Sequence, residues 1–394
     1  MRVLFISNLY PHPYQWRRAP WNRQQIAALS EQCPVRVIAP LSWIDEWRWA
    51  REQGELFTQG RRRSEGCLTI DHPTYWYPPR FLRSSYGECF RRSISCAFRA
   101  AVKEFQPEIV LAAWAYPDGW AAEKLCHETD LPCVIKVHGS DVLQMNAFSG
   151  RAGKTAAGLR AADGVVAVSD HLRREVVKLG VDEAKVNVVY DGVDTSIFSP
   201  GSKQEARESL GIPPEQAAIL FVGNLVPVKG IDRLLSAAAD LVQSTERLHV
   251  HLVGAGPEKA RLQELAIDLG VSEKVTFHGP REHAELPNWF RAANVVCLPS
   301  HSEGVPNVLL ESAACGAPFV AFDVGGIREI AHLGPSTLAP ADKPEALAGA
   351  LRPYLEENRV VGEQTPFRSF RDSASDLAKV LEGVLHARAG GCRA

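Results

Sequence analysis

The sequence predicts an α/β protein with two domains, each built on a doubly wound parallel sheet. Its 394 residues are too many for one small core, so two domains of ordinary size are the default. Short apolar segments alternate along the chain with helical patterns, which is typical of parallel strands joined by helices. Ligands of such sheets sit beyond the carboxyl ends of the strands, so we expect functional residues in the loops that follow strands.

The composition is that of an ordinary globular protein. Hydrophobic residues make up 45% and charged residues 23% of the chain, and the formal net charge is −2. No apolar run reaches the roughly eighteen residues that span a membrane, and Met1-Arg2 leads straight into a strand, so we expect a cytoplasmic protein. Nine cysteines without a C-x-x-C pair favour reduced thiols, packed mostly in the core, over disulfides or a zinc site. We expect no nucleic-acid partner.

The first domain opens with a strand, a helix and a second strand. RVLFIS (2–7) is followed by a proline-broken loop, the helical segment RQQIAALSEQ and the strand VRVIAP. The loop contains no glycine, and Arg17, Arg18 and Arg23 in or beside it could supply positive charge to a ligand. Exposed arginines on loops are also commonly just solvated, and both interpretations stay open.

Four further segments complete the first domain. EIVLAAWAY (108–116) and CVIKVHGSD (133–141) predict strands, and the second ends in His138, immediately past its strand. GVVAVSDHLRREVVKLG (164–180) predicts a strand, a capped turn and an amphipathic helix, and KVNVVYDGVDTSIFSP (185–200) supplies the closing strand. A lone histidine in such a position is often a loop or core residue, although His138 is well placed for a ligand.

The second domain opens with AILFVGNLVPVKGIDRLLSAAADL (218–241). Gly223 and Asn224 follow its strand, and Lys229 precedes its helix. A lysine charge and the N–H groups at a helix start converge here, which is a phosphate site in outline. The next strand is followed by Gly254-x-Gly256, but the third glycine of a dinucleotide fingerprint is missing.

The segment from Leu298 to Ile330 contains two strands, a helix and two glycine turns. We expect Pro306 at the first helical position, where its fixed φ suits the helix, and the helix to end near Cys315. The start of this helix offers free N–H groups and the positive end of the helix dipole, and both favour the binding of a phosphate group. Glu303 lies before the helix and Glu311 in its second turn. A carboxylate in this position can accept hydrogen bonds from two neighbouring sugar hydroxyls.

The string EGVPNVLLE resembles the E-x7-E signature of retaining glycosyltransferases of the GT-B fold, family four (glycosyltransferase group 1). Within that family, the chain is expected to belong to the branch that makes exopolysaccharide or teichuronic acid. The resemblance implies that Glu311 holds the nucleotide ribose and that Glu303 lies by the donor sugar. It also implies that His138 contacts the donor sugar from the first domain. The nucleobase is expected near Arg281, which follows Gly279-Pro280 at a strand end.

The resemblance further implies two Rossmann-like domains that face each other across a cleft. We expect an acceptor-side domain over residues 1–198, a nucleotide-sugar domain over 199–369, and a terminal helix at about 370–388 that packs back on the first. The catalytic residues would be His138, Lys229 and Glu303. The predicted donor-binding residues are Gly223, Asn224, Lys229, Arg281, Glu303, Gly304, Val305, Pro306, Asn307, Val308 and Glu311.

The implied reaction moves a sugar from a UDP or GDP donor to a hydroxyl of a glycan or lipid-linked acceptor, with retention, in polysaccharide biosynthesis. No Asp-x-Asp occurs, so we expect a metal-independent front-face mechanism without a cofactor. The sequence departs from the family at Asn224, often an arginine, and at Asp191, usually an asparagine. A sugar-nucleotide epimerase or phosphorylase of the same fold, and a non-catalytic partner subunit, stay open as alternatives.

Residues 1–105 are basic, with 16 Lys and Arg against 9 Asp and Glu. They also hold several tryptophans and a helical stripe of Phe90, Ile94 and Phe98 flanked by arginines. We therefore hypothesise that this domain rests on an anionic membrane surface, on the inner face of the cytoplasmic membrane. The alternative is that the tryptophans pack inside and the arginines pair with acids. The residues concerned are Trp43, Trp47, Trp49, Arg61, Arg62, Arg63, Arg91 and Arg92.

Overall fold

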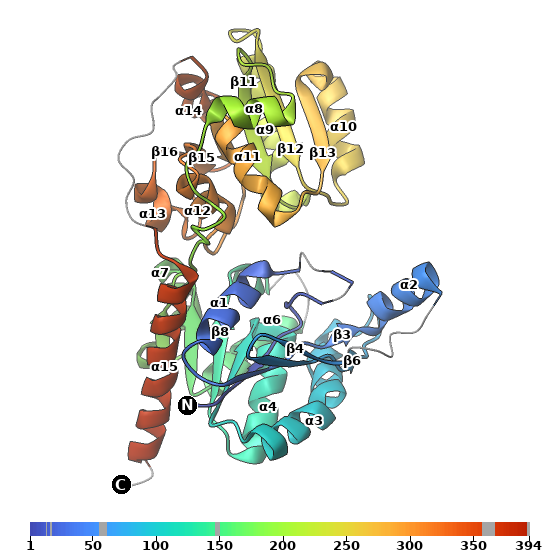
Figure 1. Ribbon diagram of the computed structural model, residues 1–394, viewed down its shortest axis with the longest axis vertical. Coiled ribbons are helices and arrows are strands. Elements are labelled where there is room, and N and C mark those ends of the chain that lie inside the picture. The colour runs from blue at the N-terminus through green and yellow to red at the C-terminus, as the bar shows by residue number, and fades with distance from the viewer. Residues whose placement is uncertain (13, 16–17, 55–60, 146–149, 357–366, 392–394) are drawn as a thin grey trace. The chain divides into compact units, whose positions relative to one another are not determined.

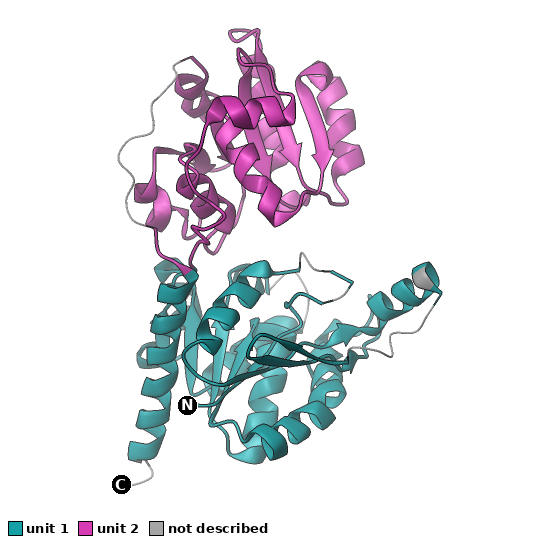
Figure 2. Ribbon diagram, in the orientation of Figure 1, with its two compact units in different colours: residues 1–191, 370–394 teal, residues 192–369 magenta. Residues whose placement is uncertain are grey.

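The computed structural model describes residues 1–12, 14–15, 18–54, 61–145, 150–356 and 367–391. Its contacts divide the chain into two compact units, residues 1–191 with 370–394 and residues 192–369 (Figure 2). Each unit is a largely parallel sheet with helices packed on both faces (Figure 1). The predicted fold class, two α/β domains of the doubly wound type, is confirmed.

Unit 1 contains an eight-stranded sheet in the order β10-β9-β8-β7-β1-β2-β5-β4 and a small sheet of β3 and β6. All pairs are parallel except the edge pair of β4 and β5. Its strands are β1 (Val3–Ile6), β2 (Val35–Ile38), β3 (Leu41–Ser42), β4 (Arg62–Glu65), β5 (Leu68–Asp71), β6 (Thr74–Tyr75), β7 (Ile109–Ala113), β8 (Cys133–Val137), β9 (Gly164–Ala167) and β10 (Val186–Val188). Its helices are α1 (Pro20–Ser30), α2 (Trp43–Gln53), α3 (Tyr86–Phe105), α4 (Trp120–Thr129), α5 (Ser140–Leu143), α6 (Arg151–Ala161), α7 (Asp170–Lys178) and α15 (Phe370–Gly391).

Both faces of the unit 1 sheet are buried, which explains the continuous apolar strands. Leu4 and Ile6 of β1 belong to one core, while Val3 and Phe5 belong to the core on the opposite face. Successive side chains of a strand point to opposite faces, so a strand covered on both sides must be apolar throughout.

The stripe of α3 is part of this interior. Phe90, Ile94 and Phe98 are fully buried in the core that also contains Leu4 and Ile6. Their spacing places them on the helix face that packs on the sheet. The hypothesis that this stripe meets a membrane is therefore wrong, and α3 packs on the sheet as an ordinary domain helix.

The terminal helix α15 packs on α1 within unit 1 (Figure 1). Leu377 and Leu381 are fully buried there. Ser373 accepts a hydrogen bond from Gln25 Nε2 at 2.7 Å and donates one to the carbonyl of Tyr190 at 2.7 Å. These contacts fix the last segment of the chain against the body of unit 1.

Unit 2 contains a six-stranded, fully parallel sheet in the order β13-β12-β11-β14-β15-β16. Its strands are β11 (Ala217–Val222), β12 (Leu248–Val253), β13 (Val275–Gly279), β14 (Val295–Leu298), β15 (Phe319–Phe322) and β16 (Ser336–Ala339). Its helices are α8 (Lys203–Leu210), α9 (Ile231–Leu241), α10 (Lys259–Asp268), α11 (Leu286–Ala292), α12 (Asn307–Ala314), α13 (Ile327–Ile330) and α14 (Pro344–Glu356).

Unit 2 begins at Gly192, seven residues before the expected boundary. Val193 pairs with Ser369, the last residue of the unit. Phe198 is buried and its ring packs against Phe290 with centroids 6.0 Å apart. The segment after the closing strand of unit 1 therefore contributes a core side chain to unit 2, which the turn-rich sequence DGVDTSIFSP did not reveal.

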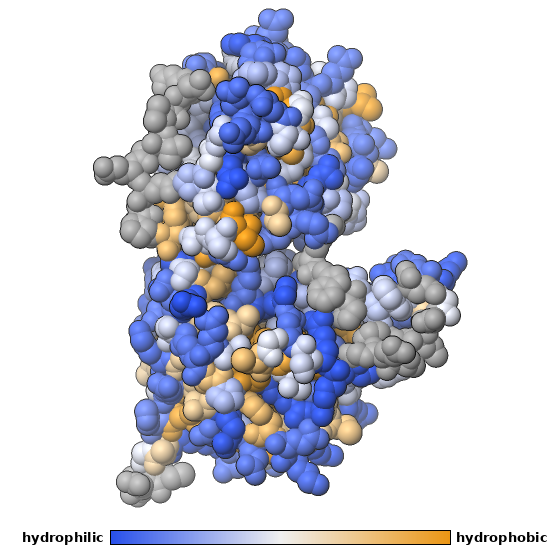
Figure 3. Space-filling model, viewed as in Figure 1, coloured by the Kyte–Doolittle hydropathy of each residue, from blue (hydrophilic) through white to orange (hydrophobic). Residues whose placement is uncertain are grey.

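Among the residues that the structure describes, no helix is long and apolar enough to cross a membrane. Over the same residues, half of the eight cysteines are buried (Cys126, Cys133, Cys297 and Cys315). Figure 3 shows a largely hydrophilic surface on the face in view, including most of the described part of α2.

Candidate functional site

The candidate site in unit 2 lies where the order of its strands reverses. The chain runs from β11 outward through β12 to β13, then returns to the other side of β11 and runs through β14 to β16. The carboxyl ends of β11 and β14 flank this switch point, which is where open α/β sheets bind ligands. Lys229 lies in the loop after β11, and Glu303 lies in the loop after β14.

Lys229 and Glu303 form an ion pair across this switch point. Lys229 Nζ donates to Glu303 Oε1 at 2.6 Å, and the two side chains are 22% and 11% exposed. The short 3₁₀ turn η5 (Pro227–Lys229) carries the lysine. Gly223 and the exposed Asn224 begin the same loop. The structure thus brings together two predicted catalytic residues that are far apart in the sequence.

Two glycines allow the loops around this pair to touch. Gly230 has φ +61°, and a Cβ there would lie 2.0 Å from the carbonyl oxygen of Pro299. Gly325 has φ +58°, and a Cβ there would lie 1.9 Å from the carbonyl oxygen of Glu303. Only glycine combines this backbone conformation with so close an approach. A hydrogen bond of 2.9 Å from Gly326 N to Gly304 O completes the packing of the turn against the loop that holds Glu303.

Helix α12 starts beside this loop. Pro306 is its N-cap, with ψ of 111°, so the prediction that Pro306 is the first helical residue was wrong by one position. The reason is that its φ of −79° suits a helix while its ψ is still extended. Gly304, Val305 and Pro306 are buried, and the Oδ1 of Asn307 is buried without a hydrogen-bond partner among the described residues. Val308 follows Asn307 in the first turn.

Glu311 lies in the second turn of α12, as predicted. Its Oε1 lies 2.9 Å from Nε2 of His283, a residue that the sequence did not single out. Burial raises the pKa of Glu311, and the hydrogen bond from His283 opposes that rise. His283 is one histidine in a polar loop, so no local pattern marked it.

Arg281, the predicted contact to the nucleobase, follows β13 and is half-buried. Its guanidinium lies over the ring of Trp289, 6.0 Å from the centroid. His278 lies on the same tryptophan with ring centroids 4.4 Å apart. Trp289 of α11 was not predicted as a site residue, since a tryptophan in a helix most often belongs to the core.

His138 lies in unit 1, directly after β8. Its ring is 6.4 Å from that of Trp21 and 6.5 Å from that of Trp114. The residue as a whole is half-buried, but its Nε2 is covered and has no partner among the described residues. Burial lowers the pKa of His138 to about 3, so the imidazole is neutral at neutral pH. Asp141 holds its loop by accepting from the backbone N–H of His138 at 3.1 Å.

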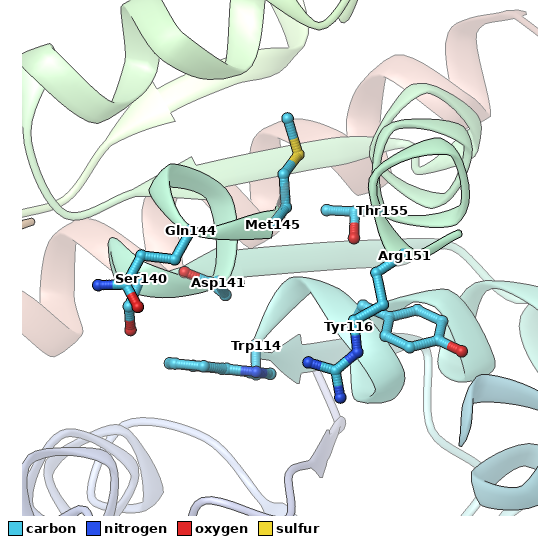
Figure 4. A pocket seen from close by; sticks show the side chains of 8 residues that line it. All are labelled: Trp114, Tyr116, Ser140, Asp141, Gln144, Met145, Arg151 and Thr155. Atoms are coloured by element: carbon cyan, nitrogen blue, oxygen red, sulfur yellow. The ribbon is translucent and has the colours of Figure 1, made fainter. Parts of the chain in front are cut away.

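A cavity of about 140 Å³ lies beside His138 in unit 1 (Figure 4). Trp114 and Asp141 line it and also contact the histidine or its backbone. Arg151 points between Trp114 and Tyr116 in Figure 4, and its guanidinium lies 5.8 Å from the centroid of the Tyr116 ring. The other lining residues are Ser140, Gln144, Met145 and Thr155. They come from loops and helices after β7 and β8, too dispersed in sequence to form a motif.

The arginines predicted for the acceptor side do not line this cavity. Arg17 lies outside the described residues. Arg18 donates to Gln15 Oε1 at 3.0 Å and to Asn8 Oδ1 at 3.1 Å. Arg23 Nε donates to Glu65 at 2.6 Å.

Two family models match the chain, each mostly within one of the two units. The model for "Glycosyltransferase Family 4" matches residues 53–197, and the model for "Glycosyl transferases group 1" matches residues 202–366. D-inositol 3-phosphate glycosyltransferase 2 of Catenulispora acidiphila is 42% identical over 207 residues, which cover 48% of each protein. The chain spans half or less of the length of the first curated relatives it matches.

Solved structures resemble the whole chain. Sucrose-phosphate synthase from Thermosynechococcus elongatus has a TM-score of 0.77 at 20% identity, over 100% of this chain and 98% of that one. Anabaena HepE in complex with UDP-glucose has a TM-score of 0.69 at 16% identity, over 99% of this chain and 100% of that one. At these identities the likeness shows the fold.

Proposed function

We propose that the protein transfers a sugar from a nucleoside-diphosphate sugar to an acceptor hydroxyl, on the premise that residues 53–197 match the family 4 model and residues 202–366 match the group 1 model of glycosyltransferases. The observation that carries the proposal is the Lys229–Glu303 pair at the switch point of unit 2. HepE, which shares the fold, is named as a complex with UDP-glucose, which supports a UDP donor over GDP.

The donor is bound through its charged and hydroxyl groups. Lys229 and the N–H groups at the start of α12 are proposed to hold the diphosphate, because Lys229 contacts Glu303 and α12 begins a few residues after Glu303. Glu311 accepts hydrogen bonds from the ribose hydroxyls, and Arg281 stacked on Trp289 borders the base. Glu303, fixed by Lys229, lies by the donor sugar.

The chemistry proposed is a front-face transfer with retention of the anomeric configuration. The bond between the anomeric carbon and the diphosphate oxygen breaks as the acceptor oxygen attacks, and the leaving diphosphate takes the acceptor proton. Lys229 and α12 stabilise the charge that develops on the diphosphate, so the reaction needs neither a metal ion nor a cofactor. His138 is neutral, so it contacts the donor sugar as a hydrogen-bonding group and not as a cation.

The acceptor is proposed to occupy the cavity of unit 1 rather than the loop of Arg18 and Arg23. Trp114 gives the cavity an aromatic wall, and hydroxyl and amide groups of Thr155 and Gln144 can hydrogen-bond sugar hydroxyls. Arg151 would suit an anionic substituent. A glycan or a lipid-linked sugar of a polysaccharide pathway meets these requirements, and the curated relatives are named for D-inositol 3-phosphate, also a polyol.

Peripheral contact with the inner, anionic face of the cytoplasmic membrane is proposed at only part of the surface that the sequence suggested, because most of the other residues named there are paired or packed. Arg61 is paired with Glu46, while Arg91 and Arg92 are both paired with Glu88. Arg62 and Arg63 likewise pair with acidic side chains. Trp43 stacks on Trp76 and donates to the carbonyl of Tyr77, and the ring of Trp49 lies 4.4 Å from that of Tyr14.

Among the described tryptophans, the exposed ones are Trp47 and Trp76, which are 55% and 61% exposed. Arg51 lies over Trp47, 5.7 Å from the ring centroid, so aromatic and cationic groups share this surface. This combination suits a headgroup region with anionic lipids. In vesicle co-sedimentation, Trp47→Ser with Trp76→Ser should lower binding to anionic vesicles, while Ile267→Ser, equally exposed in unit 2, should not. Equal recovery of the parent protein with neutral and anionic vesicles would refute the contact.

The test of the function is a panel of UDP and GDP sugars, with release of nucleoside diphosphate as the signal. We expect slow release by hydrolysis with one donor, faster release with a sugar acceptor, and a product of the same anomeric configuration by NMR. Glu303→Gln serves as the control and should abolish release. Conversion of the sugar nucleotide without release would identify an epimerase, and binding without either reaction would identify a partner subunit.

A further inference from the structure

We propose that His283 is a positioning residue for Glu311, which fixes the carboxylate in its bound orientation and keeps it ionised for the nucleotide ribose. The inference rests on the proposed function, in which Glu311 accepts hydrogen bonds from the ribose hydroxyls. It adds a residue that neither the E-x7-E string nor its spacing identifies, since His283 lies 28 positions before Glu311 in a separate loop.

The capped turn holds the backbone of His283, and a buried aromatic ring packs against its imidazole. His283 begins the short 3₁₀ turn η7 (His283–Glu285), and a reciprocal pair of hydrogen bonds between Glu282 and Glu285 caps that turn. The buried ring of Phe198 packs edge-on against His283 with centroids 4.8 Å apart. Nε2 then lies 2.9 Å from Oε1 of Glu311. A ring fixed in this way presents its N–H to the carboxylate in one direction only.

The hydrogen bond also determines which carboxylate oxygen is left for a ligand. Oε1 is engaged by His283, whereas Oε2 accepts no hydrogen bond from the described residues and remains for hydroxyl groups. A carboxylate pinned through one oxygen loses less conformational freedom when a ligand binds the other. His283 therefore acts on affinity through Glu311 and not through its own contact with the nucleotide.

The charge of Glu311 depends on the same contact. Three titratable groups interact electrostatically around Glu311. His283 of η7 interacts with Glu311 directly. Cys315, one turn further along α12, interacts with Glu311 and with Arg291 of α11. Burial raises the pKa of Glu311, and His283 is the group that lowers it. Without His283 the pKa would rise further, and a protonated carboxyl group would lose the charge-assisted hydrogen bonds to ribose.

Loss of His283 should make the nucleotide affinity depend on pH. A carboxyl group with a raised pKa is ionised only above that pKa, so a variant without His283 should bind nucleotide poorly at low pH and recover as the pH rises. A merely structural histidine would give a loss that is the same at every pH.

The experiment is a titration of the folded full chain with UDP and GDP between pH 6 and pH 8. For His283→Ala we expect about tenfold weaker binding at pH 6, with the gap to the parent shrinking toward pH 8. His283→Gln keeps an N–H donor on the side chain and should restore most of the affinity. His332→Ala, an exposed histidine of the same unit, is the matched control and should match the parent.

The double variant His283→Ala with Glu311→Gln tests whether His283 acts by positioning Glu311 or only by stabilising the fold. We expect His283→Ala to cost less than twofold when Glu311 is already glutamine, because no carboxylate remains to be positioned. A loss that is equal at all pH values, or equal in the Glu311→Gln background, would overturn the inference. Failure of the parent to bind any nucleoside diphosphate would instead refute the proposed function, and with it the role of Glu311.

Discussion

The substitution Gly325→Ala tests whether close contact of two loops holds Glu303 in place. Gly325 has φ +58°, a left-handed conformation that costs an alanine about 1–2 kcal/mol. In addition, the new Cβ would lie 1.9 Å from the carbonyl oxygen of Glu303, about 1 Å or more inside any contact seen for a real Cβ. The neighbouring atom is backbone, so the turn or the Glu303 loop must move.

Movement of about 1 Å at a positioned catalytic group can lower turnover about 100-fold. We therefore expect Gly325→Ala to reduce kcat/KM for the donor about 10-fold to 100-fold and to lower stability by about 2–4 kcal/mol. The assay is release of nucleoside diphosphate across donor concentrations, together with urea unfolding of the same preparation.

Gly211→Ala is the matched control. Gly211 lies in the same unit with φ +67°, but a Cβ there would meet no atom within 4 Å. It should lose about 1–2 kcal/mol of stability from the backbone strain alone, with kcat/KM unchanged. Equal losses of turnover in the two variants, or unchanged turnover in Gly325→Ala, would refute the reasoning that this contact positions Glu303.

Three further predictions concern the Lys229–Glu303 ion pair, the sugar contact proposed for His138, and the lowered pKa of His251. Lys229→Ala should lower donor affinity and turnover, and should destabilise unit 2 by about 1–2 kcal/mol because Glu303 is left half-buried and unpaired; adding Glu303→Gln should restore stability in urea unfolding but not turnover. His138→Ala should reduce kcat while UDP affinity in titration calorimetry stays within about threefold, because the proposal gives it contact with the sugar only; an equal fall in UDP affinity would contradict that. His251, whose pKa burial lowers to about 3, binds a proton more readily when unfolded, so stability should fall as pH drops below about 6.5, and His251→Gln should remove about 1 kcal/mol of the loss between pH 7.5 and pH 5.5.

Local patterns in the sequence were sufficient for many elements of the fold, but not for β3, α2, β4, β5 and β6. The apolar run at β1 predicts a strand buried on both faces, and Leu4 and Phe5 do belong to cores on opposite faces. The glycine turn at Gly325 and the helix that carries Glu311 were predicted because caps and periodicity act over a few residues. The one-residue error at Pro306 arises because φ alone does not decide where a helix begins.

Pairs that join distant segments were outside the reach of these patterns. The contact between Lys229 and Glu303 spans 74 positions, and it exists because the sheet order places β11 beside β14. The sequence indicated Lys229 from a phosphate-site pattern and Glu303 from the family resemblance, but it did not predict their ion pair. His283 and the cavity at Trp114 had no local signal at all, because an isolated polar residue acquires its role only from the neighbours that the fold supplies.

The amphipathic stripe of α3 shows a different failure. Phe90, Ile94 and Phe98 have the spacing of a helix face, and spacing does not say whether that face meets a sheet or a membrane. The arginines around the stripe could equally have bound lipid phosphates or paired with acidic residues. In the structure, Arg91 and Arg92 form ion pairs with Glu88 on the same helix. Exposure in the folded chain was needed to show that, of the tryptophans the sequence indicated, Trp47 is the one on the surface.

Binding of UDP and GDP to the parent and to Glu311→Ala tests the central claim most directly, because it needs no acceptor. If α12 and the loops of unit 2 form the nucleotide site, Glu311→Ala removes charge-assisted hydrogen bonds to ribose and should weaken binding by about 2–4 kcal/mol, or roughly 30-fold to 1,000-fold. Calorimetric titration should show this loss for the nucleotide that the parent binds. Affinity of the variant within about threefold of the parent would contradict the account.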